Sequence, residues 1–427
     1  MKHLLYVLTF VIANCLFACA DEFRWQNGTL YSENNIADKL SGETTDGITV
    51  ASETITPLGD NTFKVVRTYK AKKDVDSARI CFDYVHSGKD KPATIGVYYF
   101  DGWAGKHKLA DDPNEPWAKN APISLSRRMV EEFPEREPLW GWRDDTQEIM
   151  ERQIDLAADN GVDFFLFCWY WHDNKGTINI EAIENAPLHT SMELYLTAKN
   201  KKRLKYSLLI ANHRDFEILG NENWESAVKY WSKFFKDPQY IKVDGKPLVV
   251  LFGTGDNAIT NEQIAKMQET AKKEGFKDGL AIAGCYESAK QKAFTFSTHY
   301  NLNSGYSSGH EEHKFQELID RVKPRWKGTE EQPYIPVINS GWDKRPWENP
   351  NGPSQGWYFP DSSPELFKSF LKDAIHWMDE NPTKTTKERL VLIYAWNELG
   401  EGGYLVPTKV DPDAAKLKMI KEVVNEK

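Results

Sequence analysis

Residues 390–404 read LVLIYAWNELGEGGY, an apolar run that passes directly into a loop with two carboxylates. The first six residues, Leu390 to Ala395, have the length and composition of a strand buried on both faces. Glycines at positions 400, 402 and 403 favour a loop directly after this strand. Glu398 and Glu401 are therefore expected where a buried strand opens into a loop, which is where α/β proteins position their active sites.

Two aromatic residues, Trp396 and Tyr404, flank these glutamates. Glycosidic-bond chemistry uses paired carboxylates, one to give or take a proton and one to act on the sugar, and flat sugar faces stack on aromatic rings. The alternative is a pair of solvated loop glutamates, because Glu is mostly exposed in proteins. The position after a buried strand favours the first interpretation, in which Glu398 and Glu401 are catalytic.

From residue 95 onward the sequence alternates between apolar runs of strand length and amphipathic runs of helix length. This order predicts an α/β protein with a parallel sheet, and the length fits a (β/α)8 TIM barrel with enlarged loops. A doubly wound sheet is the alternative. The predicted strands are Ile95–Phe100, Val162–Tyr170, Tyr206–Ile210, Leu248–Phe252, Leu280–Cys285, Phe296–Tyr300, Tyr334–Asn339 and Leu390–Trp396. The predicted helices are Thr146–Asn160, Trp224–Phe235, Asn261–Glu274, Phe315–Lys323, Pro364–Glu380 and Ala414–Lys427.

Residues 20–92 have a different composition, dense in Thr, Ser, Asp and Gly. Short alternating runs such as Ile48–Thr54 and Thr62–Tyr69 are separated by the turn signal Gly59-Asp60-Asn61. This pattern predicts a small β-rich N-terminal extension, with a loosely packed arm as the alternative. The barrel is expected to occupy residues 93–427.

Residues 1–19 are predicted to be a lipoprotein signal peptide, because Lys2 and His3 precede a mostly apolar run that is short for a bilayer span. Leu16-Phe17-Ala18-Cys19 resembles a bacterial lipobox, in which Cys19 is lipidated, and Ala18-Cys19-Ala20 also fits an ordinary cleavage site. Asp21-Glu22 resembles the acidic export signal of surface lipoproteins in the Bacteroides group. An exported outer-membrane lipoprotein is therefore expected, facing the periplasm or the cell surface.

The composition also limits the expected partners. The formal net charge of −9 argues against a nucleic-acid partner, and no segment beyond the leader predicts a membrane-spanning helix, so a lipid anchor is the expected membrane contact. Five cysteines, two of them in the leader, form no disulfide or zinc pattern. No glycine-rich phosphate loop is present, and His310-Glu311-Glu312-His313 lacks the spacing of a zinc motif. We therefore expect a monomer with no cofactor and no metal.

In a barrel, the residues directly after each strand converge on the rim that carries the active site. Aromatic and short polar side chains at these positions suit a cleft for a neutral sugar, although each could instead pack on a neighbour within its loop. The residues predicted to bind a glycan in this way are Tyr99, Asp101, Trp103, Trp171, His172, Asn212, His213, Tyr300, Trp342, Asp343, Trp396, Asn397 and Tyr404.

The stretch Ala395-Trp396-Asn397-Glu398, followed by Glu401-Gly402 and by Leu405-x-Pro407, resembles the signature of two related groups. One is glycoside hydrolase family 99, the retaining endo-α-mannosidases, and the other is the WbsX-like proteins, which carry a glycosyltransferase label. The resemblance covers roughly residues 95–410 and is specific through the order and spacing of its motifs. The other similar motifs are Val97–Phe100, Gly161–Phe165 with Trp169–Trp171, Asp237–Leu248, and Gly341-Trp342-Asp343.

The resemblance to family 99 implies a role for each glutamate. Glu398 would deprotonate the 2-hydroxyl of the sugar, which attacks the anomeric carbon to form a 1,2-anhydro sugar. Glu401 would act as acid on the leaving oxygen and then as base on water. The sequence departs from the family signature at Leu399-Gly400, where family 99 has Trp and His, and at Val406, where it has Glu. These departures concern the substrate more than the reaction class.

The first functional hypothesis is an exported retaining glycoside hydrolase acting on an oligo- or polysaccharide, and the resemblance implies an α-mannoside. One alternative is a glycosyltransferase of polysaccharide assembly, against which the export leader argues, because the sugar donor is normally cytoplasmic. The other is a non-catalytic carbohydrate-binding lipoprotein, against which the pair of glutamates beside aromatic rings argues.

Overall fold

The computed structural model describes residues 91–172, 178–213, 215–253, 259–285, 293–302, 311–348 and 356–426, together with the strands β1 to β7 between residues 5 and 84. The chain divides into two compact units, Met1–Lys91 and Pro92–Lys427. Each unit is described by itself.

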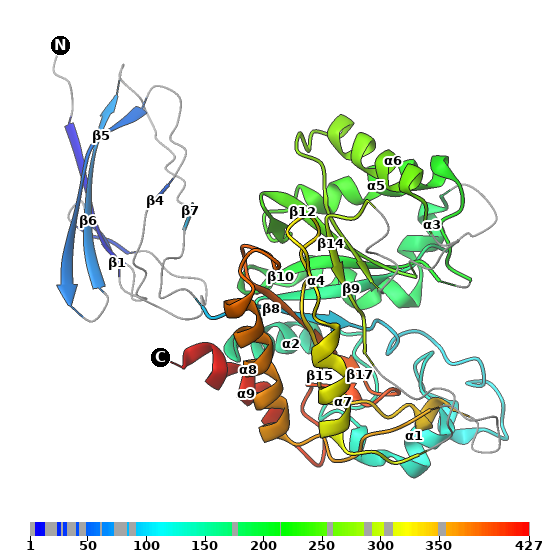
Figure 1. The fold of residues 1–427 in the computed structure, drawn as a ribbon. Helices are drawn as coiled ribbons and strands as arrows, with labels where there is room; N and C mark the ends of the chain where they lie inside the picture. The colour runs from blue at the N-terminus through cyan, green and yellow to red at the C-terminus, as the bar shows by residue number, and fades with distance from the viewer. Residues whose placement is uncertain are drawn as a thin grey trace. The chain divides into compact units, whose positions relative to one another are not determined.

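The N-terminal unit contains two small sheets (Figure 1). β1 lies within the predicted leader, and Cys19 lies outside the described residues, so the predictions of export and lipidation stay predictions. The first sheet has the order β2-β3-β1-β6-β5, and in the second β4 pairs with β7. Their bounds are β1 Leu5–Ile12, β2 Arg24–Gln26, β3 Thr29–Tyr31, β4 Leu40–Ser41, β5 Ile48–Gly59, β6 Thr62–Ala71 and β7 Asp83–Tyr84.

The second unit is a (β/α)8 barrel, as predicted. Its strands are β8 Thr94–Tyr99, β9 Phe164–Trp169, β10 Lys205–Ala211, β12 Lys246–Phe252, β13 Ala281–Cys285, β14 Phe296–Thr298, β15 Val337–Asn339 and β16 Leu390–Tyr394. They pair in parallel in the order β14-β13-β12-β10-β9-β8-β16-β15. A short strand, β11 Lys242–Val243, adds to β12 in the antiparallel direction.

The two ends of this path meet at Ser297, which forms a parallel bridge with Tyr334. The Ser297 N–H donates to the carbonyl of Pro333 at 3.0 Å, and the N–H of Ile335 donates to the carbonyl of Ser297 at 2.9 Å. These bonds bring the sixth and seventh strands of the barrel together. The nearly closed ring excludes the doubly wound alternative, whose sheet would be open.

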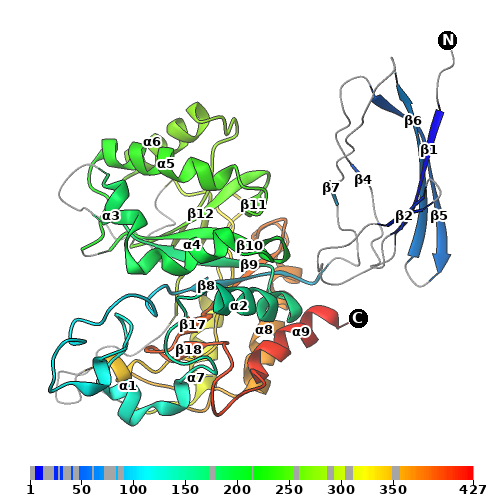
Figure 2. The same ribbon diagram turned by 180° about the vertical axis from the view of Figure 1, so that it is seen from behind.

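The helices surround the barrel, and α5 packs with α6 as α8 packs with α9 (Figures 1 and 2). Their bounds are α1 Arg127–Glu132, α2 Gln147–Asp159, α3 Ile180–Glu184, α4 Thr190–Thr197, α5 Asn221–Phe235, α6 Asn261–Lys273, α7 Phe315–Val322, α8 Pro364–Glu380 and α9 Ala415–Asn425. The start of α8 is as predicted, with Pro364 in its first turn and the Ser363 hydroxyl accepting from the Leu366 N–H. The short helices α3 and α4 were not predicted, because so few turns give little periodic signal.

Aromatic side chains pack between the barrel strands and the helices around them. The ring of Phe165 lies 5.2 Å from that of Tyr99 and 5.0 Å from that of Trp396, measured between centroids. The Trp396 indole N–H donates to Oε1 of Gln153 at 2.6 Å, so its polar atom is satisfied inside the core. The inside of the barrel is also packed, because the Tyr98 ring lies 4.9 Å from that of Tyr300 and the Tyr98 hydroxyl donates to the His299 carbonyl at 2.8 Å.

Candidate active site

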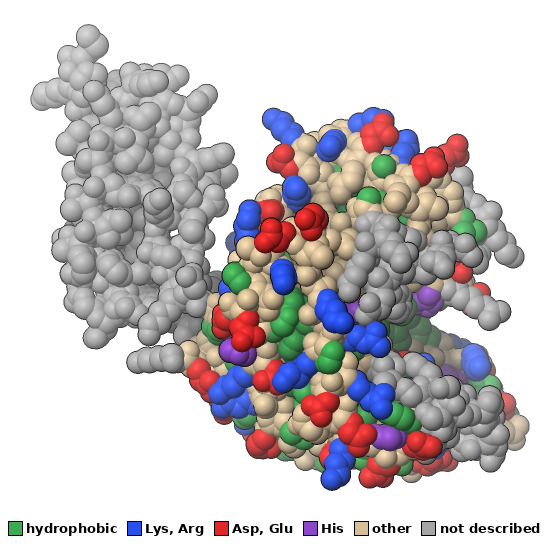
Figure 3. Space-filling model, in the orientation of Figure 1, with side chains coloured by type: hydrophobic (Ala, Val, Ile, Leu, Met, Phe, Trp, Pro, Cys, Tyr) green, Lys and Arg blue, Asp and Glu red, His purple; other side chains and the backbone are tan. Residues whose placement is uncertain are grey.

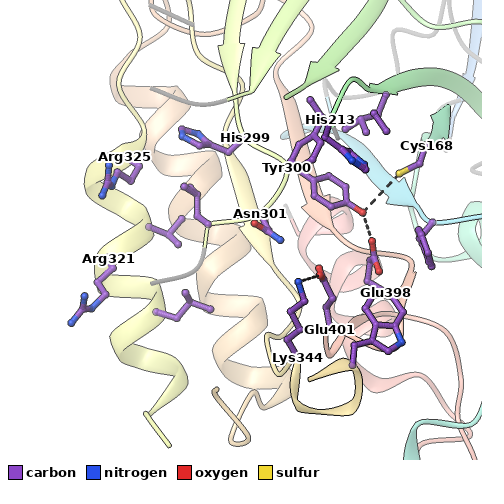
Figure 4. Close-up of a pocket in the computed structure, with 18 of the residues that line it drawn as sticks. Cys168, His213, His299, Tyr300, Asn301, Arg321, Arg325, Lys344, Glu398 and Glu401 are labelled. Atoms are coloured by element: carbon purple, nitrogen blue, oxygen red, sulfur yellow. Dashed lines mark hydrogen bonds and ion pairs between the residues drawn. The ribbon is translucent and has the colours of Figure 1, made fainter. Parts of the chain in front are cut away.

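A cavity of about 1240 Å³ is lined by residues at the carboxyl ends of the strands, and both Glu398 and Glu401 line it (Figure 4). The wall around them is largely aromatic and apolar, and includes Tyr170, Phe216 and Phe252. A cavity with apolar walls and a few convergent polar groups is the usual form of a small-molecule site.

Glu398 is the buried carboxylate of the pair, with 4% of its surface exposed. It lies in β17 Asn397–Glu398, which pairs with β18 Gly403–Tyr404 directly after β16. The Tyr300 hydroxyl donates to its Oε1, whereas its Oε2 has no hydrogen-bond partner among the described residues. Burial raises the pKa of Glu398 well above its usual range and the charge of Glu401 raises it further, against the opposing effects of Tyr300 and Lys344.

Glu401 has different neighbours. The Tyr394 hydroxyl donates to its Oε2, and Lys344 Nζ lies 3.2 Å from its Oε1 (Figure 4). Burial raises the pKa of Tyr394 well above its usual range, so this phenol stays protonated and acts as a donor. The two glutamates therefore share one cavity but have unlike partners, a phenol for one and a phenol with an ammonium group for the other.

The loop that carries the glutamates is fixed to the loop that follows β15. The Asp343 N–H donates to the carbonyl of Glu401 at 2.6 Å, and Arg136 Nη1 donates to the carbonyls of Asp343 and Leu399 at 2.9 and 3.0 Å. Gly402 has a φ of +74°, and a Cβ there would lie 2.7 Å from the Asp343 nitrogen, so glycine is required for this close approach. Burial opposes the ionised form of Asp343, but its pKa is lowered overall because Arg345 and Arg136 outweigh that effect.

Asn397 anchors the same loop from the other side. Its Oδ1 accepts from the Phe100 N–H at 2.8 Å, and its Nδ2 donates to the Phe100 carbonyl at 2.9 Å and to Asp144 Oδ2 at 3.3 Å. The Trp103 indole N–H donates to the Asn397 carbonyl at 2.9 Å. Asn397 and Trp103 are both predicted to bind substrate. In the structure their side-chain hydrogen bonds instead fix the position of Asn397, the residue before Glu398.

Of the predicted glycan-binding residues, His213 and Tyr300 line the cavity. Tyr99 and Trp396 pack between the barrel strands and the surrounding helices. The Tyr99 ring lies 4.9 Å from that of Phe167, and the Trp396 indole bonds Gln153 of α2. Asp101 accepts from the N–H groups of Ser191 and Met192 at 2.7 and 3.3 Å. Its carboxylate therefore caps the first turn of α4 and does not line the cavity.

The remaining predicted residues also lie away from the cavity lining. Trp342 is buried with its ring 6.0 Å from that of Tyr394, and Trp171 is buried with its ring 6.3 Å from that of Trp169. Asn212 accepts from the Ile218 N–H at 2.8 Å and so fixes its own loop. His172 contacts the rings of His189 and Phe216, and Tyr404 pairs through its backbone with Asn397. The position of a residue directly after a strand predicts that it lies near the rim of the barrel. The direction of its side chain decides whether it faces the cavity.

The prediction from sequence missed several lining residues, among them Lys344, Cys168, Tyr170, Arg321 and Arg325. It also missed Tyr394, which holds Glu401. Lys344 directly follows the Gly341-Trp342-Asp343 motif, so the rule that selected Trp342 and Asp343 could have found it. Cys168 and Tyr394 lie inside apolar strands, where the sequence pattern predicts core residues.

Among the described residues no group of His, Cys, Asp and Glu is arranged to hold a metal ion, and His310 lies outside them. His313, at the end of the same motif, bonds Glu317 through Nδ1 at 2.8 Å. In the described part of the chain, every helix is too short or too polar to cross a membrane.

Solved structures support the fold. One described as a glycoside hydrolase-like protein aligns with a TM-score of 0.55 at 15% identity, covering 83% of this chain and 98% of that one. The family 99 endo-α-mannosidase from Bacteroides thetaiotaomicron aligns with a TM-score of 0.52 at 15% identity, covering 78% of this chain and 96% of that one. At this identity the likeness concerns the fold alone.

The alignment with relatives found by sequence covers less than half of their length. The uncharacterized protein WxcX of Xanthomonas campestris pv. campestris is 21% identical over 353 residues, which is 74% of this chain and 47% of that protein. The chain thus spans about half the length of the curated relatives it matches. The family model described as Glycosyltransferase WbsX matches residues 141–419, which include the loop with both glutamates. This chain therefore belongs to the family described as Glycosyltransferase WbsX.

Proposed function

We propose that this protein is a retaining glycoside hydrolase that cleaves a glycan by means of Glu398 and Glu401. The observation that carries the proposal is that both carboxylates line one cavity at the end of β16 and have unlike partners. Two carboxyl groups in different surroundings can divide the work of acid and base. The resemblance to family 99 and the fold shared with an endo-α-mannosidase support an assignment to glycosidic bonds.

Glu398 is the proposed base for the sugar 2-hydroxyl. Its raised pKa makes its carboxylate a stronger base, and Oε2, which has no protein partner among the described residues, is where a substrate hydroxyl would donate. As the hydroxyl proton passes to Glu398, the 2-oxygen attacks the anomeric carbon and the bond from that carbon to the leaving oxygen breaks. The product of this step is a 1,2-anhydro sugar.

Glu401 is the proposed acid and base at the leaving group. In its protonated form it gives its proton to the leaving oxygen. In the second step its carboxylate takes a proton from water, the water oxygen bonds to the anomeric carbon, and the bond to the 2-oxygen breaks. The 2-oxygen then recovers a proton from Glu398, so both glutamates return to their starting states and the anomeric configuration is retained.

The mechanism limits the sugar. The 2-oxygen must attack from the face opposite the leaving group, a requirement that an α-mannoside meets. We therefore propose an α-mannoside as the substrate class, which agrees with the description of the family 99 structures as endo-α-mannosidases.

The description of the family suggests a second candidate, a glycosyltransferase. The same pair of carboxylates could transfer a sugar to an acceptor hydroxyl in place of water. Titration with nucleotide sugars tests this candidate, because a transferase of that kind must bind its donor and a hydrolase need not.

The purified protein should release new reducing ends from α-mannan oligosaccharides, and NMR should show the α-anomer first. Glu398→Gln and Glu401→Gln should each lose most of this activity, while a non-catalytic binding protein would bind the oligosaccharide without cleaving it. Full activity in both single variants would refute the assignment of the site.

A further inference from the structure

Two arginines line the cavity at a distance along the chain from the glutamates. Arg321 lies in the last turn of α7, and Arg325 lies in the 3-10 helix Lys323–Arg325 that continues it. Residues four apart share one face of a helix, which agrees with both lining the same cavity. Both side chains are exposed, so they lie at its open edge. In Figure 4 both side chains project from this helical segment on the side away from Glu398 and Glu401.

Arg321 is held in place by an aromatic ring. Its guanidinium carbon lies 4.2 Å from the centroid of Trp357, and His313 stacks on the same indole at 3.7 Å. Glu317, one turn back on the helix, accepts a bond from His313 at 2.8 Å. The pKa of Glu317 is lowered mainly by this bond and also by the charge of Arg321. A guanidinium lying on an indole ring is restricted before any ligand arrives, which lowers the entropy cost of binding.

The charge of Arg321 is not neutralised by an ion pair within the described residues. Other arginines of the barrel have carboxylate partners, as Arg136 has in Asp343 and Arg203 has in Asp155. The simplest alternative role for Arg321 is stabilisation of the C-terminal end of α7, where cations are favourable by roughly 0.3–1 kcal/mol. That role accounts for a cation at this position, but it does not require the side chain to line a cavity.

The rest of the surface does not favour anions. The formal net charge is −9, and positive and negative side chains are intermixed over the face shown in Figure 3. The only carboxylate beside the arginines in the lining is Asp320 among the described residues, and it accepts a bond from Gln316. Any preference for an anion would therefore come from the cavity edge itself and not from long-range attraction.

We propose that the glycan substrate carries an anionic substituent, a carboxylate or a sulfate ester, and that Arg321 binds it with Arg325 beside it. Guanidinium groups bind planar and tetrahedral oxyanions through paired N–H bonds. The sugar to be cleaved lies at Glu398 and Glu401, and the charged sugar lies toward α7, away from the two carboxylates that would repel it. This proposal rests on the proposed function, because it assigns a substrate class to the same cavity.

The experiment uses three ligands made from one α-mannan oligosaccharide, namely the neutral parent, a form oxidised to the carboxylate at C6, and a sulfated form. Binding is measured by calorimetry with the full chain carrying Glu401→Gln, so that cleavage is slow during the titration. We expect at least one charged form to bind roughly tenfold or more tightly than the parent, which corresponds to one bidentate Arg–anion contact. The carboxylate and the sulfate arms show which anion is preferred.

Substitutions test whether Arg321 causes the preference for the charged ligand. Arg321→Ala should abolish the preference for the charged ligand, so that charged and neutral forms bind with similar affinity, and Arg321→Lys should restore part of the preference. The matched control is Lys323→Ala, because Lys323 lies between the two arginines, pairs with Asp373 at 2.8 Å and does not line the cavity. A melting curve for each variant detects loss of the helix end.

Failure of this proposal and failure of the proposed function give different results. Equal affinity for all three ligands, no binding of either charged form, or equal losses for neutral and charged ligands in Arg321→Ala would overturn the anion site. If the wild type still cleaves the neutral glycan in that case, the hydrolase assignment stands. A charge preference that depends on Arg321 without cleavage of any ligand would support the anion site and refute the hydrolase.

Discussion

Lys344 Nζ lies 3.2 Å from Oε1 of Glu401, which joins the loop after β15 to the loop after β16 by an ion pair inside the cavity. The effect of Lys344 extends to the other glutamate, because its charge also lowers the pKa of Glu398. One ammonium group thus acts on both members of the proposed catalytic pair.

Replacement of Lys344 by Met should move the acid limb of the pH–activity profile to higher pH. Burial and Glu401 already raise the pKa of Glu398, and removal of the opposing lysine charge raises it further. Because the base must be ionised, activity is lost as pH falls through that pKa. Lys344→Arg keeps the charge and should shift the limb less. An unchanged acid limb of kcat/KM in the Met variant would contradict the role of Glu398 as base.

Glu401→Gln and Glu398→Gln should lower activity by roughly 10²–10⁴, the usual range for an acid or base group, but they should differ in rescue. A dinitrophenyl glycoside needs little protonation of its leaving oxygen, so it should recover much of the loss in the Glu401 variant and little in the Glu398 variant. A substrate without the 2-hydroxyl should be inert to the wild type. Detection of a glycosyl ester on either glutamate would replace the neighbouring-group mechanism by a direct nucleophile.

Asp144→Asn should make the stability of the barrel less sensitive to pH. Burial raises the pKa of Asp144 to about 7 from an ordinary 3.8, although the bonds from Tyr99 and Asn397 oppose this rise. Between those values the folded state holds a proton that the unfolded state has lost, so stability falls as pH rises through this window and stays reduced above pH 7. The variant cannot ionise and should melt near the wild type at low pH and above it at high pH. Asp145→Asn is the matched control, and a melting difference independent of pH would contradict the prediction.

Trp342→Ala should destabilise the fold by about 3–5 kcal/mol, as expected for loss of a large core side chain. Trp342 is 2% exposed and lies against Tyr394, so the change leaves a cavity behind the phenol that holds Glu401. Denaturant unfolding measures the loss, and Leu219→Ala, at a residue 55% exposed, should change little. Lost glycan binding with unaltered stability would restore the sequence-based prediction that this ring stacks on sugar.

Expression of the full chain in a bacterium that processes lipoproteins should yield protein that begins at a diacylated Cys19. The lipobox-like Leu16-Phe17-Ala18-Cys19 is the basis of this prediction. Intact-mass measurement of detergent-extracted protein checks it, and Cys19→Ala should abolish the lipid mass. An unmodified N-terminus at Asp21 would show an ordinary cleavage site while leaving export in place.

The sequence alone determined the strands, most of the long helices and the position of the glutamates after the last strand. These features depend on local signals, such as the apolar run Leu390–Ala395 and the Ser363-Pro364 start of α8. The tertiary structure decided which side chains face the cavity, because that depends on side-chain direction and on partners far away in the chain. Trp103 lies 294 positions from the carbonyl it bonds at Asn397, and Arg136 lies 263 positions from Leu399. No local pattern encodes such contacts, and so Tyr394 and Lys344 could be recognised as partners of Glu401 only after the loops had come together.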